Sequence, residues 1–435
     1  MFGTSGIRGA VGGSITASLA VDLGRAVASE GYEHVVVGRD SRESGRVLVD
    51  ALSAGARECG ADVTALGLAS TPTVARAIEA YDADVGVSVT ASHNPETDNG
   101  FKLWNPSGQA FGASQRDAIE ARLADDEYEL TGWDGHGSKM TRHDAVDRHA
   151  AALESAVDIV DSLDIIVDVG NGAGQVTATA LTALGCHVET LNAQPDGSFP
   201  ARPSEPTAET CARLSEVVAA TDADLGIAHD GDADRMMAVS EDGEFLSGDA
   251  LLALFARHAI DDDHRKIAAP LNTSLAVDDY IDPVGGTVER TKVGDVYVAE
   301  ALSQPGFAFG GEPSGAWIWP GQTRCPDGPL AACTLAALVS EAASLSSLLA
   351  DFEAYPIRRE SIETDEKEAT MERVEQRVLA SYDDVETIDG VRVAFDDGWF
   401  LVRASGTQPL VRVTAEARDA DRADELLDAA QSLLD

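Results

Sequence analysis

The chain has 435 residues, of which 44% are hydrophobic and 25% charged, so it is globular and too long for a single domain of ordinary size. Asp and Glu total 75 against 32 Lys and Arg, which gives a formal net charge of −43 at pH 7. A surface this acidic repels nucleic acid and anionic lipid and excludes both as general partners. It also repels phosphorylated ligands, so any phosphate site must be a local cluster of cations and backbone amides.

The cysteines and the apolar runs bear on where the protein works. The five cysteines form no C-x-x-C pair and are expected to be reduced core thiols: Cys59, Cys186, Cys211, Cys325 and Cys333. The N-terminal stretch has no apolar signal region, and no run approaches the ~18 apolar residues of a membrane span. The expected localisation is therefore cytoplasmic, with no membrane partner.

Two stretches of the sequence repeat one another. Residues 82–87 read DADVGV and residues 222–227 read DADLGI. Each follows a helix-like segment and continues as a short β-run, which ends in the polar loop TASHNP (90–95) or DGDADR (230–235). A fainter third copy begins at Gly306 and runs into GGEPSG. The repeat predicts three related units.

Each unit opens with an apolar strand that stops at a polar turn, and these strands are residues 34–38, 164–169 and 266–269. Continuous apolar runs suit strands buried on both faces, and their alternation with helical patterns indicates parallel pairing through right-handed crossovers. The tail differs, because an acidic, helix-favouring run precedes short strands and a closing helix, at 360–380, 391–395, 399–403, 410–415 and 422–434. This pattern is typical of a smaller α+β domain.

The expected fold class is α/β, with three similar mixed-sheet α/β domains plus a smaller C-terminal α+β domain around a central cleft. The predicted domains are residues 1–146, 147–246, 247–353 and 354–435. In open α/β sheets, ligands gather at the carboxyl ends of strands. Polar, glycine-rich loops leave strand ends in each domain, so we expect one cleft lined by all four.

The TASHNP loop places Ser92 directly after the predicted strand 85–89, beside His93 and before Pro95. A serine between small residues is a candidate nucleophile, although most loop serines only bond their own turn. The sequence around Ser92 has no G-x-S-x-G elbow, so an esterase fits poorly.

The DGDADR loop carries Asp230, Asp232 and Asp234 at i, i+2 and i+4, which puts three carboxylates on one face of an extended segment. Like charges this close require a cation, and hard oxygen ligands favour Mg²⁺ or Ca²⁺. A calcium-binding helix–loop–helix is the rival, because Glu241 stands at its twelfth position. That loop needs Gly at its sixth position, where this chain has Arg235, and its flanks here resemble strands. The spacing favours Mg²⁺, and a solvated acidic turn is the remaining alternative.

The RASGTQP segment (403–409) is a candidate phosphate nest. It offers Arg403, the Ser405 and Thr407 hydroxyls and the amides around Gly406. Arg412 on the following strand could add a second guanidinium that binds phosphate through two N–H groups. An ordinary Ser-Gly-Thr hairpin is the alternative.

Two further loops carry polar groups of the same kind. The N-terminal FGTSGIRG holds Arg8 in a glycine-rich turn. GEPSG presents Glu312 and Ser314, a pair suited to sugar hydroxyls.

Taken together, these motifs resemble the α-D-phosphohexomutase family, which includes phosphoglucomutases, phosphomannomutases and phosphoglucosamine mutases. The resemblance covers essentially the whole chain, and the motifs come in the family's order: FGTSGIRG, TASHNP followed by Asn99-Gly100-Phe101-Lys102, DGDADR, TKVGD at 291–295, GEPSG and RASGTQP.

The resemblance implies a role for each matching residue. Ser92 would carry the phosphoryl group, and the phosphoserine with the three aspartates would hold one Mg²⁺. The catalytic set expected is Ser92, Lys102, Arg8 and His93, with Lys102 as the proton-handling partner because a lysine pKa shifts readily on burial. The substrate-binding set expected is Arg235, Lys292, Glu312, Ser314, Arg403, Ser405, Gly406, Thr407 and Arg412.

The implied reaction interconverts hexose 6-phosphate and hexose 1-phosphate through a hexose 1,6-bisphosphate, which turns end over end before it returns a phosphate to Ser92. TKVGD lacks the His found there in dual mannose/glucose enzymes and looks more like phosphoglucosamine mutases, which favours glucosamine phosphate. The alternatives are a phosphoglucomutase or phosphomannomutase of the same mechanism, a non-catalytic sugar-phosphate-binding protein, and a metal-dependent phosphatase. The oligomeric state stays open between monomer and dimer.

Two positions depart from the family pattern, and two tryptophans beside one of them need a separate interpretation. Ala316 stands where many relatives have His, and Gln408 stands where many have Glu. Trp317 and Trp319 are expected in the domain core rather than as a sugar-stacking platform.

The charge predicts a protein adapted to concentrated salt. Screening acts over about 3 Å at 1 M salt, so KCl should weaken the self-repulsion of the acidic surface. We expect the thermal unfolding midpoint to rise with KCl concentration. A melting temperature that is indifferent to KCl would instead mark an unusually acidic protein without this adaptation.

Overall fold

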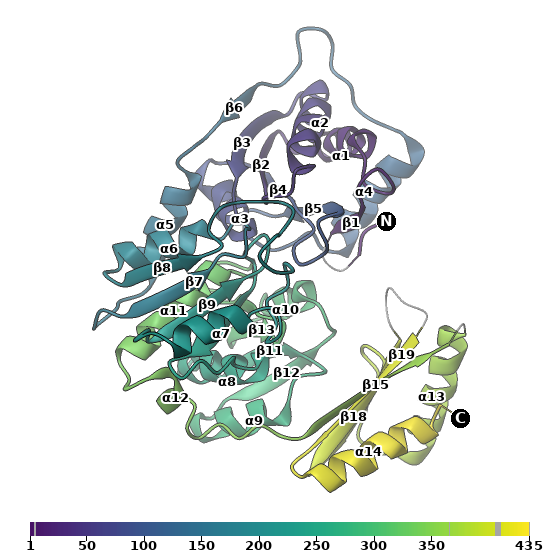
Figure 1. The fold of residues 1–435 in the computed structure, drawn as a ribbon. Coiled ribbons are helices and arrows are strands. Elements are labelled where there is room, and N and C mark those ends of the chain that lie inside the picture. The colour runs from purple at the N-terminus through teal and green to yellow at the C-terminus, as the bar shows by residue number, and fades with distance from the viewer. Residues whose placement is uncertain (4–5, 365, 405–409, 435) are drawn as a thin grey trace. The chain divides into compact units, whose positions relative to one another are not determined.

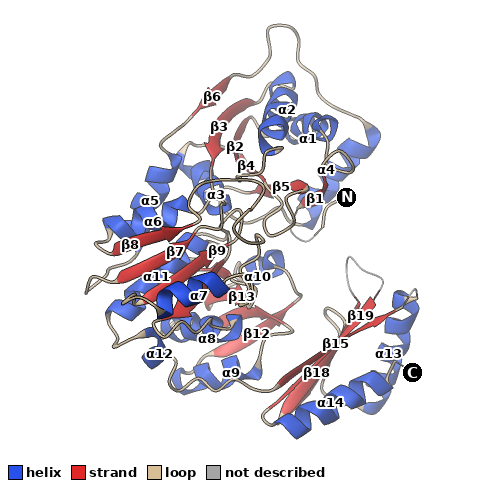
Figure 2. Ribbon diagram, viewed as in Figure 1, coloured by secondary structure: helices blue, strands red, loops and turns tan. Residues whose placement is uncertain are grey.

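The structure is a computed structural model that describes residues 1–3, 6–364, 366–404 and 410–434. The chain forms two compact units, residues 1–251 with 314–350 and residues 252–313 with 351–435. They are called the first and second units below. Figure 1 labels the helices and strands, and Figure 2 shows helices and strands alternating along much of the chain.

The first unit begins with a six-stranded mixed sheet in the order β1-β5-β4-β2-β3-β6. Its strands are β1 (Ile7–Ala10), β2 (His34–Arg39), β3 (Asp62–Leu68), β4 (Val85–Val89), β5 (Asp98–Trp104) and β6 (Lys139–Thr141). Its helices are α1 (Ala17–Ser29), α2 (Gly45–Glu58), α3 (Thr71–Ala80) and α4 (Ala113–Asp125). The strands β2, β3, β4 and β6 pair in parallel, whereas β5 runs antiparallel to both β1 and β4.

The central strands of this sheet position two loops at one edge. Strands β2 and β4 are almost wholly buried, as their continuous apolar runs predict. They pair in parallel with Arg39 opposite Val89, so the chain leaves both strands at the same edge. Residues that follow these two strands therefore lie close together.

A second sheet in the first unit has the order β10-β9-β7-β8. Its strands are β7 (Asp164–Asp168), β8 (His187–Leu191), β9 (Leu225–His229) and β10 (Met236–Ser240). The unit also contains α5 (Ala145–Ala156), α6 (Gln175–Ala183), α7 (Ala212–Ala219), β14 (Ala316–Ile318), α11 (Gly328–Ser340) and α12 (Leu345–Leu348). Strand β7 is parallel to β8 and β9, and β10 is antiparallel to β9.

The sequence repeat has a structural counterpart. The carboxylate of Asp84, in the first copy, accepts from the backbone amide of His34 at 2.8 Å, where the neighbouring strand begins. Asp224 does the same for the amide of Asp164, also at 2.8 Å. The glycine two residues later lies under the preceding helix, so a Cβ on Gly86 or Gly226 would come within 2.8 Å of a helical side chain. Each repeat thus fixes the register of one strand and seats one helix against it.

The second unit contains the parallel strands β12, β11 and β13, neighbours in that order. These elements are α8 (Gly248–Ala259), β11 (Lys266–Pro270), α9 (Leu275–Ile281), the short η1 (Asp282–Val284), β12 (Thr287–Thr291), α10 (Asp295–Ala301) and β13 (Phe307–Glu312). The third copy of the repeat is recognisable here, because a Cβ on Gly310 would lie 2.7 Å from Val298 of α10.

The C-terminal part of the second unit is an antiparallel sheet in the order β15-β19-β18-β17-β16. Its elements are β15 (Ile357–Glu363), α13 (Lys367–Ser381), β16 (Val385–Glu386), β17 (Val391–Phe395), β18 (Gly398–Ala404), β19 (Leu410–Ala417) and α14 (Ala420–Ser432). Both helices pack on one face of the sheet, where Val374 and Leu426 join a core with Phe400 (Figure 2).

The opposite face of this sheet packs on the parallel strands of the same unit. Trp399 and Leu401 contact Leu271 there. The buried carboxylate of Glu416 accepts from the Trp399 indole at 2.7 Å and from the Leu275 amide at 2.8 Å. The polar groups of this interface are therefore paired, and the sheet is fixed within its unit.

The expected fold class is confirmed, but one element is wrong. The run 360–380 was predicted as helix, whereas Glu360–Glu363 belong to β15 and the helix begins at Lys367. Strand β15 pairs with β19 over all seven of its residues, and this pairing outweighs the helix propensity of the acidic side chains. Within the described residues, no helix is both long enough and apolar enough to cross a membrane.

Candidate active site

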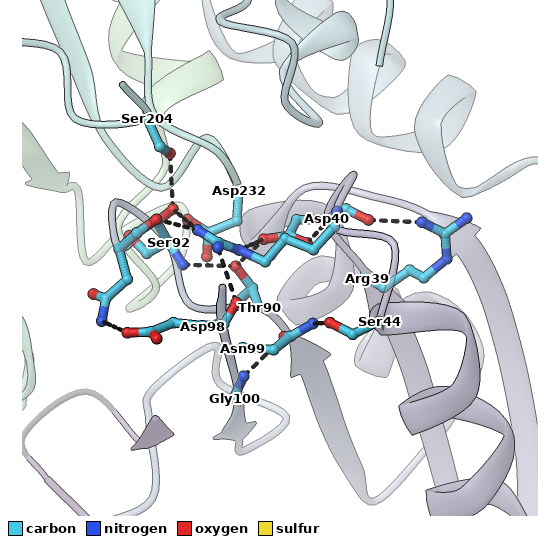
Figure 3. Close-up of polar contacts among 12 residues, drawn as sticks. Arg39, Asp40, Ser44, Thr90, Ser92, Asp98, Asn99, Gly100, Ser204 and Asp232 are labelled. Atoms are coloured by element: carbon cyan, nitrogen blue, oxygen red, sulfur yellow. Dashed lines mark hydrogen bonds and ion pairs between the residues drawn. The ribbon is translucent and has the colours of Figure 1, made fainter. Parts of the chain in front are cut away.

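Ser92 lies in the loop that leaves β4 and is 1% exposed. Its φ is +52°, in the left-handed region that residues other than glycine seldom adopt. Such a conformation costs about 1–3 kcal/mol and persists only where the surroundings fix it. Here the Ser92 amide donates to the Thr90 hydroxyl at 2.8 Å, and the Ser92 carbonyl accepts from the Ser204 hydroxyl at 2.9 Å (Figure 3).

The three aspartates of DGDADR lie in the loop that joins β9 to β10. Asp230, Asp232 and Asp234 are buried, and one oxygen from each lies within 4.8 Å of the other two. Thr71, at the start of α3, braces this loop, because its amide donates to the Asp232 carbonyl at 2.9 Å and its hydroxyl donates to the Asp232 carboxylate at 2.6 Å. The predicted convergence of the three carboxylates is therefore present.

The serine loop and the aspartate loop meet. The Ser92 hydroxyl donates to the Asp230 carboxylate, with Oγ 2.6 Å from Oδ2. Gly231 permits this approach, because a Cβ there would lie 2.7 Å from the Ser204 hydroxyl and 2.8 Å from the Ser92 carbonyl. The sequence predicted these loops to share a site, and the structure brings them into direct contact.

Lys102 reaches the aspartates from β5. Its ammonium donates to Asp232 at 2.7 Å and also to Asp234. Burial alone lowers the pKa of Lys102, but Asp232 and Asp234 outweigh burial and raise the pKa above its ordinary value. The expectation that burial would prepare Lys102 to give up its proton does not hold in this arrangement, where Lys102 is a fixed cation.

His93 and Arg8 complete the predicted catalytic set. The His93 ring nitrogen Nδ1 lies 3.4 Å from the Ser92 hydroxyl. Burial, followed by the charges of Arg235, Arg8 and Lys102, lowers the pKa of His93 to about 2, so its imidazole is neutral near pH 7. Arg8 on β1 stands opposite Gly100 of β5, and its buried Nε has no hydrogen-bond partner among the described residues.

The aspartate cluster is suited to a metal ion. Burial and the charges of Asp234 and Asp232 raise the pKa of Asp230 well above its ordinary value, which is the signature of carboxylates that repel one another. Oδ1 of Asp232 is buried and has no hydrogen-bond partner within the part of the chain that the structure describes, so the cluster has an oxygen to offer a cation. An all-oxygen donor set fits Mg²⁺ or Ca²⁺. The helix–loop–helix calcium motif is wrong for this loop, because β9 and β10 flank it.

The other two predicted residues of the first unit lie beside the aspartate loop. The Arg235 amide donates to Asp230 at 3.2 Å, and its guanidinium donates to Glu205 at 3.1 Å. Ser314 precedes Gly315, whose carbonyl accepts from the Met236 amide at 2.9 Å. The end of the GEPSG loop is thus attached to the strand that leaves the aspartates.

The second unit brings together its own predicted residues. The Glu312 carboxylate accepts from the Gly294 amide of TKVGD at 2.6 Å, and the Lys292 ammonium lies 5.5 Å from the centre of the Tyr297 ring. Arg403 and Arg412 are directly paired across β18 and β19, so their side chains share one face of the hairpin. The remaining predicted residues, Ser405, Gly406 and Thr407, lie outside the described residues.

Asp389 links these groups and was not foreseen from the sequence. Its Oδ2 accepts from Arg403 at 3.2 Å and from the Val293 amide of TKVGD at 3.1 Å. Two like-charged arginines paired across a hairpin repel one another, and a phosphate would offset that repulsion.

The two tryptophans after GEPSG differ in exposure. Trp317 is fully buried, and its indole donates to the Met236 carbonyl at 2.8 Å, as a core residue would. Trp319 is only half-buried.

Sequence reasoning also missed two buried arginines. Arg42 lies in the RDSR turn after β2, and Arg202 lies in the segment between β8 and α7. Each pairs with the aspartate at the end of a central strand, Arg42 with Asp40 at 2.9 Å and Arg202 with Asp168 at 2.7 Å. One signal in the sequence could have pointed to them: RDSR and Asp168 both stand where the first apolar strand of a repeat unit ends.

Comparison with known proteins places the whole chain in one family. Four models of the phosphoglucomutase/phosphomannomutase family match in order: α/β/α domain I over residues 1–129, α/β/α domain II over 146–243, α/β/α domain III over 247–355, and the C-terminal domain over 361–432. Together they cover well over half of the chain.

Individual relatives agree with this result. The chain is 44% identical to a probable phosphoglucosamine mutase of Methanopyrus kandleri, over 98% of this chain and 96% of the relative, and 44% identical to that of Methanosarcina acetivorans, over 100% and 98%. A phosphoglucomutase/phosphomannomutase family structure from Burkholderia thailandensis superposes with a TM-score of 0.89 at 29% identity, covering 100% of this chain and 98% of that one.

The aspartate cluster predicts that a divalent cation stabilises the fold. We expect Mg²⁺ added to EDTA-treated protein to raise the melting temperature. At a Mg²⁺ concentration a hundred times the Kd, binding should add about 2.7 kcal/mol to the free energy of unfolding. Asp230→Asn should abolish this shift, and without metal it should melt no lower than the wild type because one of three like charges is gone. Asp327→Asn removes a buried carboxylate elsewhere in the first unit and should keep the shift. A melting temperature insensitive to Mg²⁺ and Ca²⁺ would contradict the metal site.

Proposed function

The chain belongs to the phosphoglucomutase/phosphomannomutase family of phosphohexomutases, and we propose that it interconverts glucosamine 6-phosphate and glucosamine 1-phosphate through a phosphorylated Ser92. The observation that carries this proposal is the 2.6 Å contact between the Ser92 hydroxyl and the Asp230 carboxylate. A nucleophile and a cluster of acidic oxygens in contact are the minimum that phosphoryl transfer through a serine requires.

The proposed reaction has two transfers. In the first, the bond between phosphorus and Ser92 Oγ breaks, a new bond forms to the free hydroxyl oxygen of the sugar phosphate, and the proton of that hydroxyl ends on Ser92 Oγ. The product of this step is a 1,6-bisphosphate. In the second, the bond between the other phosphorus and its sugar oxygen breaks, the phosphoryl group returns to Ser92 Oγ, and the Ser92 hydroxyl proton leaves while the sugar oxygen takes up a proton. Asp230 accepts that hydroxyl hydrogen in the structure, so it is the proposed acceptor.

The cations around Ser92 have the complementary role. Phosphoryl transfer depends on positioning and charge neutralisation more than on covalent chemistry. We propose that Arg8, Lys102 and Arg235 offset the negative charge of the phosphoryl oxygens. Lys102, held as a cation by Asp232 and Asp234, would then donate a hydrogen bond rather than act as a base. His93, neutral and 3.4 Å from Ser92, would orient the hydroxyl.

The metal is proposed to be Mg²⁺, held by Asp230, Asp232, Asp234 and the phosphorylated Ser92. The buried Asp232 oxygen without a hydrogen-bond partner supports this fit. When bound, Mg²⁺ would supply Lewis-acid neutralisation of the phosphoserine oxygens. Support from outside the chain comes from a solved Aspergillus fumigatus N-acetylphosphoglucosamine mutase in complex with GlcNAc-6P and magnesium, which shares the fold at a TM-score of 0.61 and 16% identity.

The TKVGD, GEPSG and RASGTQP loops, with Arg412, are proposed to supply the substrate contacts. Arg403 and Arg412, with Ser405, Gly406 and Thr407, would hold the phosphate that is not reacting. Glu312 and Ser314 would bind sugar hydroxyls, and Lys292 in TKVGD would contact the same substrate. We also propose that the chain has four domains, residues 1–146, 147–246, 247–353 and 354–435, each of which contributes one of the functional loops.

The choice of glucosamine rests on the named relatives and on TKVGD, and a phosphoglucomutase or phosphomannomutase would use the same residues. Hexose 1,6-bisphosphate is the proposed activator, because it would phosphorylate Ser92. A coupled assay decides the sugar. It compares the 1-phosphates and 6-phosphates of glucosamine, glucose and mannose, with Mg²⁺ and high KCl. We further propose that the enzyme works in a salty cytoplasm.

Replacing Ser92 tests the nucleophile. Ser92→Ala should abolish turnover, and intact-mass analysis of active wild-type enzyme should show one phosphate that Ser92→Ala lacks. The control is Ser107→Ala. Ser107 is exposed in the turn that follows β5 of the same sheet, so this variant should keep both the phosphate and the activity. A phosphate that persists in Ser92→Ala, or turnover without Ser92, would exclude the proposed mechanism. Free phosphate released faster than isomerised product would point to a phosphatase instead.

Replacing Arg403 tests whether this residue binds the phosphate that is not reacting. A hydrogen bond to a charged group contributes about 1.5–3 kcal/mol, so Arg403→Ala should raise KM roughly tenfold to a hundredfold with a smaller effect on kcat. The matched control is Arg359→Ala, an exposed arginine on β15 of the same sheet, which should leave KM unchanged. Steady-state kinetics in which Arg403→Ala keeps the wild-type KM would rule out this role.

A further inference from the structure

The backbone of the Ser92 loop needs an external support. Ser92 has a left-handed backbone, and its only described side-chain contacts are the bond to Asp230 and the long contact to His93. The direction of its hydroxyl is therefore set by whatever holds the backbone on either side. That support comes from residues with no assigned role in the reaction.

Arg42 provides most of this support. Its guanidinium is fully buried and donates to the carbonyls of Ser92 at 2.9 Å, Asn94 at 2.6 Å and Asp98 at 2.9 Å, and also to that of Pro95. One planar cation thus gathers four carbonyls of a single loop, a task for which its fixed fork of five N–H donors is suited.

Asp40 and Thr90 fix the arginine in turn. Asp40 accepts from the Arg42 amide and from its Nε, both at 2.9 Å, and also from the Thr90 hydroxyl at 2.7 Å. Thr90 then accepts from the Ser92 amide (Figure 3). The Ser92 peptide is therefore held at its amide by Thr90 and at its carbonyl by Arg42.

The segment 197–204, which lies in the connection between β8 and α7, packs against Arg42 and the serine loop. The Phe199 ring lies 5.0 Å from the Arg42 guanidinium carbon, and the backbone at Gly197 is so close that a Cβ would lie 2.5 Å from Arg42 Cα. The Ser204 hydroxyl donates to the Ser92 carbonyl at 2.9 Å. This segment shields Arg42 from water and ties the serine loop to the second sheet.

Arg202 makes the equivalent contacts for the aspartate loop. It pairs with Asp168, and its guanidinium donates to the carbonyl of His229, the residue before Asp230, at 2.6 Å. It also donates to the Ser204 carbonyl at 3.4 Å. The two buried arginines are thus linked through Ser204, one holding the serine loop and the other holding the metal-ligand loop.

We infer that Arg42 is a positioning residue for phosphoryl transfer, which fixes the Ser92 backbone so that its hydroxyl lies on Asp230, and that Arg202 positions the aspartate loop separately. This inference rests on the proposed function of Ser92. It distinguishes the two arginines by what they should affect: Arg42 the transfer step, and Arg202 the affinity for metal.

Matched lysine substitutions test the difference. Arg42→Lys and Arg202→Lys each keep a buried charge beside an aspartate but lose the fork that binds several carbonyls. Because small misplacements of a reacting group are costly, Arg42→Lys should lower kcat by about 10²-fold. It should lower equally the rate at which hexose 1,6-bisphosphate phosphorylates Ser92, followed by intact mass. Its KM and its half-saturating Mg²⁺ concentration should stay near the wild-type values.

Arg202→Lys should show the reverse pattern. Arg202 holds the backbone next to Asp230, and loss of an outer contact of a metal site typically weakens metal affinity by about 10–100-fold, so the half-saturating Mg²⁺ concentration should rise by that factor while kcat at saturating Mg²⁺ is largely kept. Thermal melts of both variants measure their folding. If Arg42→Lys does not fold, Ser204→Ala serves instead, and loss of its one bond to the Ser92 carbonyl should lower kcat by about twofold to tenfold with KM unchanged.

Two outcomes would overturn the inference. One is an Arg42→Lys enzyme, or a Ser204→Ala enzyme, with wild-type kcat. The other is a pair of lysine variants that lose kcat, metal affinity and stability in the same proportions, as a merely structural role would predict. A wild-type enzyme that never becomes phosphorylated on Ser92 would instead contradict the proposed function itself.

Discussion

The mutual repulsion of the three buried aspartates is the constraint on which the rest of the first unit depends. Their oxygens lie within 4.8 Å of one another in a site with little water to screen them. The groups that offset this charge, Lys102, Thr71 and the Ser92 hydroxyl, all come from the first sheet or its helices. Removing one partner of a buried ion pair costs about 3–5 kcal/mol, so loss of Lys102 would leave an uncompensated buried charge on the aspartates. The interactions that prepare a cation site therefore also join the two sheets of the unit.

This dual role bears on three residues whose backbones are strained. Ser92, Ala233 and Phe199 all have positive φ, and all three lie where the serine loop, the aspartate loop and the segment 197–204 meet. A left-handed backbone outside glycine is unfavourable in isolation, but the serine loop joins β4 to β5, the aspartate loop joins β9 to β10, and hydrogen bonds attach the segment 197–204 to both sheets. The rigid sheets thus supply the free energy that holds the reacting groups in a geometry they would not adopt alone.

Much of this could be predicted from the sequence, because the strong signals are local. Strand β4 was predicted at its observed residues, since Val85–Val89 is a short apolar run bounded by turns. The meeting of Ser92 with Asp230 was expected from the resemblance of the motifs to a known family, because β4 and β9 belong to different sheets and the rule for one sheet does not join their loops. Arg42 and Arg202 escaped notice because their partners are backbone carbonyls, which every residue has. Arg42 contacts residues 50 or more positions away, and no side-chain pattern marks them. Strand β15 was missed because its pairing with β19 is likewise distant in sequence.

The extreme surface charge and the chemistry of the site are separable in physical terms. With 75 acidic side chains against 32 basic ones, the exterior repels the phosphates that the enzyme is proposed to handle. Three cations beside the site, Arg42, Lys102 and Arg202, are buried and already paired with carboxylates or carbonyls. Salt at 1 M screens exposed charges over about 3 Å but acts far less on buried pairs. Concentrated counterions would therefore weaken the repulsion outside and leave these internal pairs intact, so an acidic surface is compatible with the proposed phosphate site.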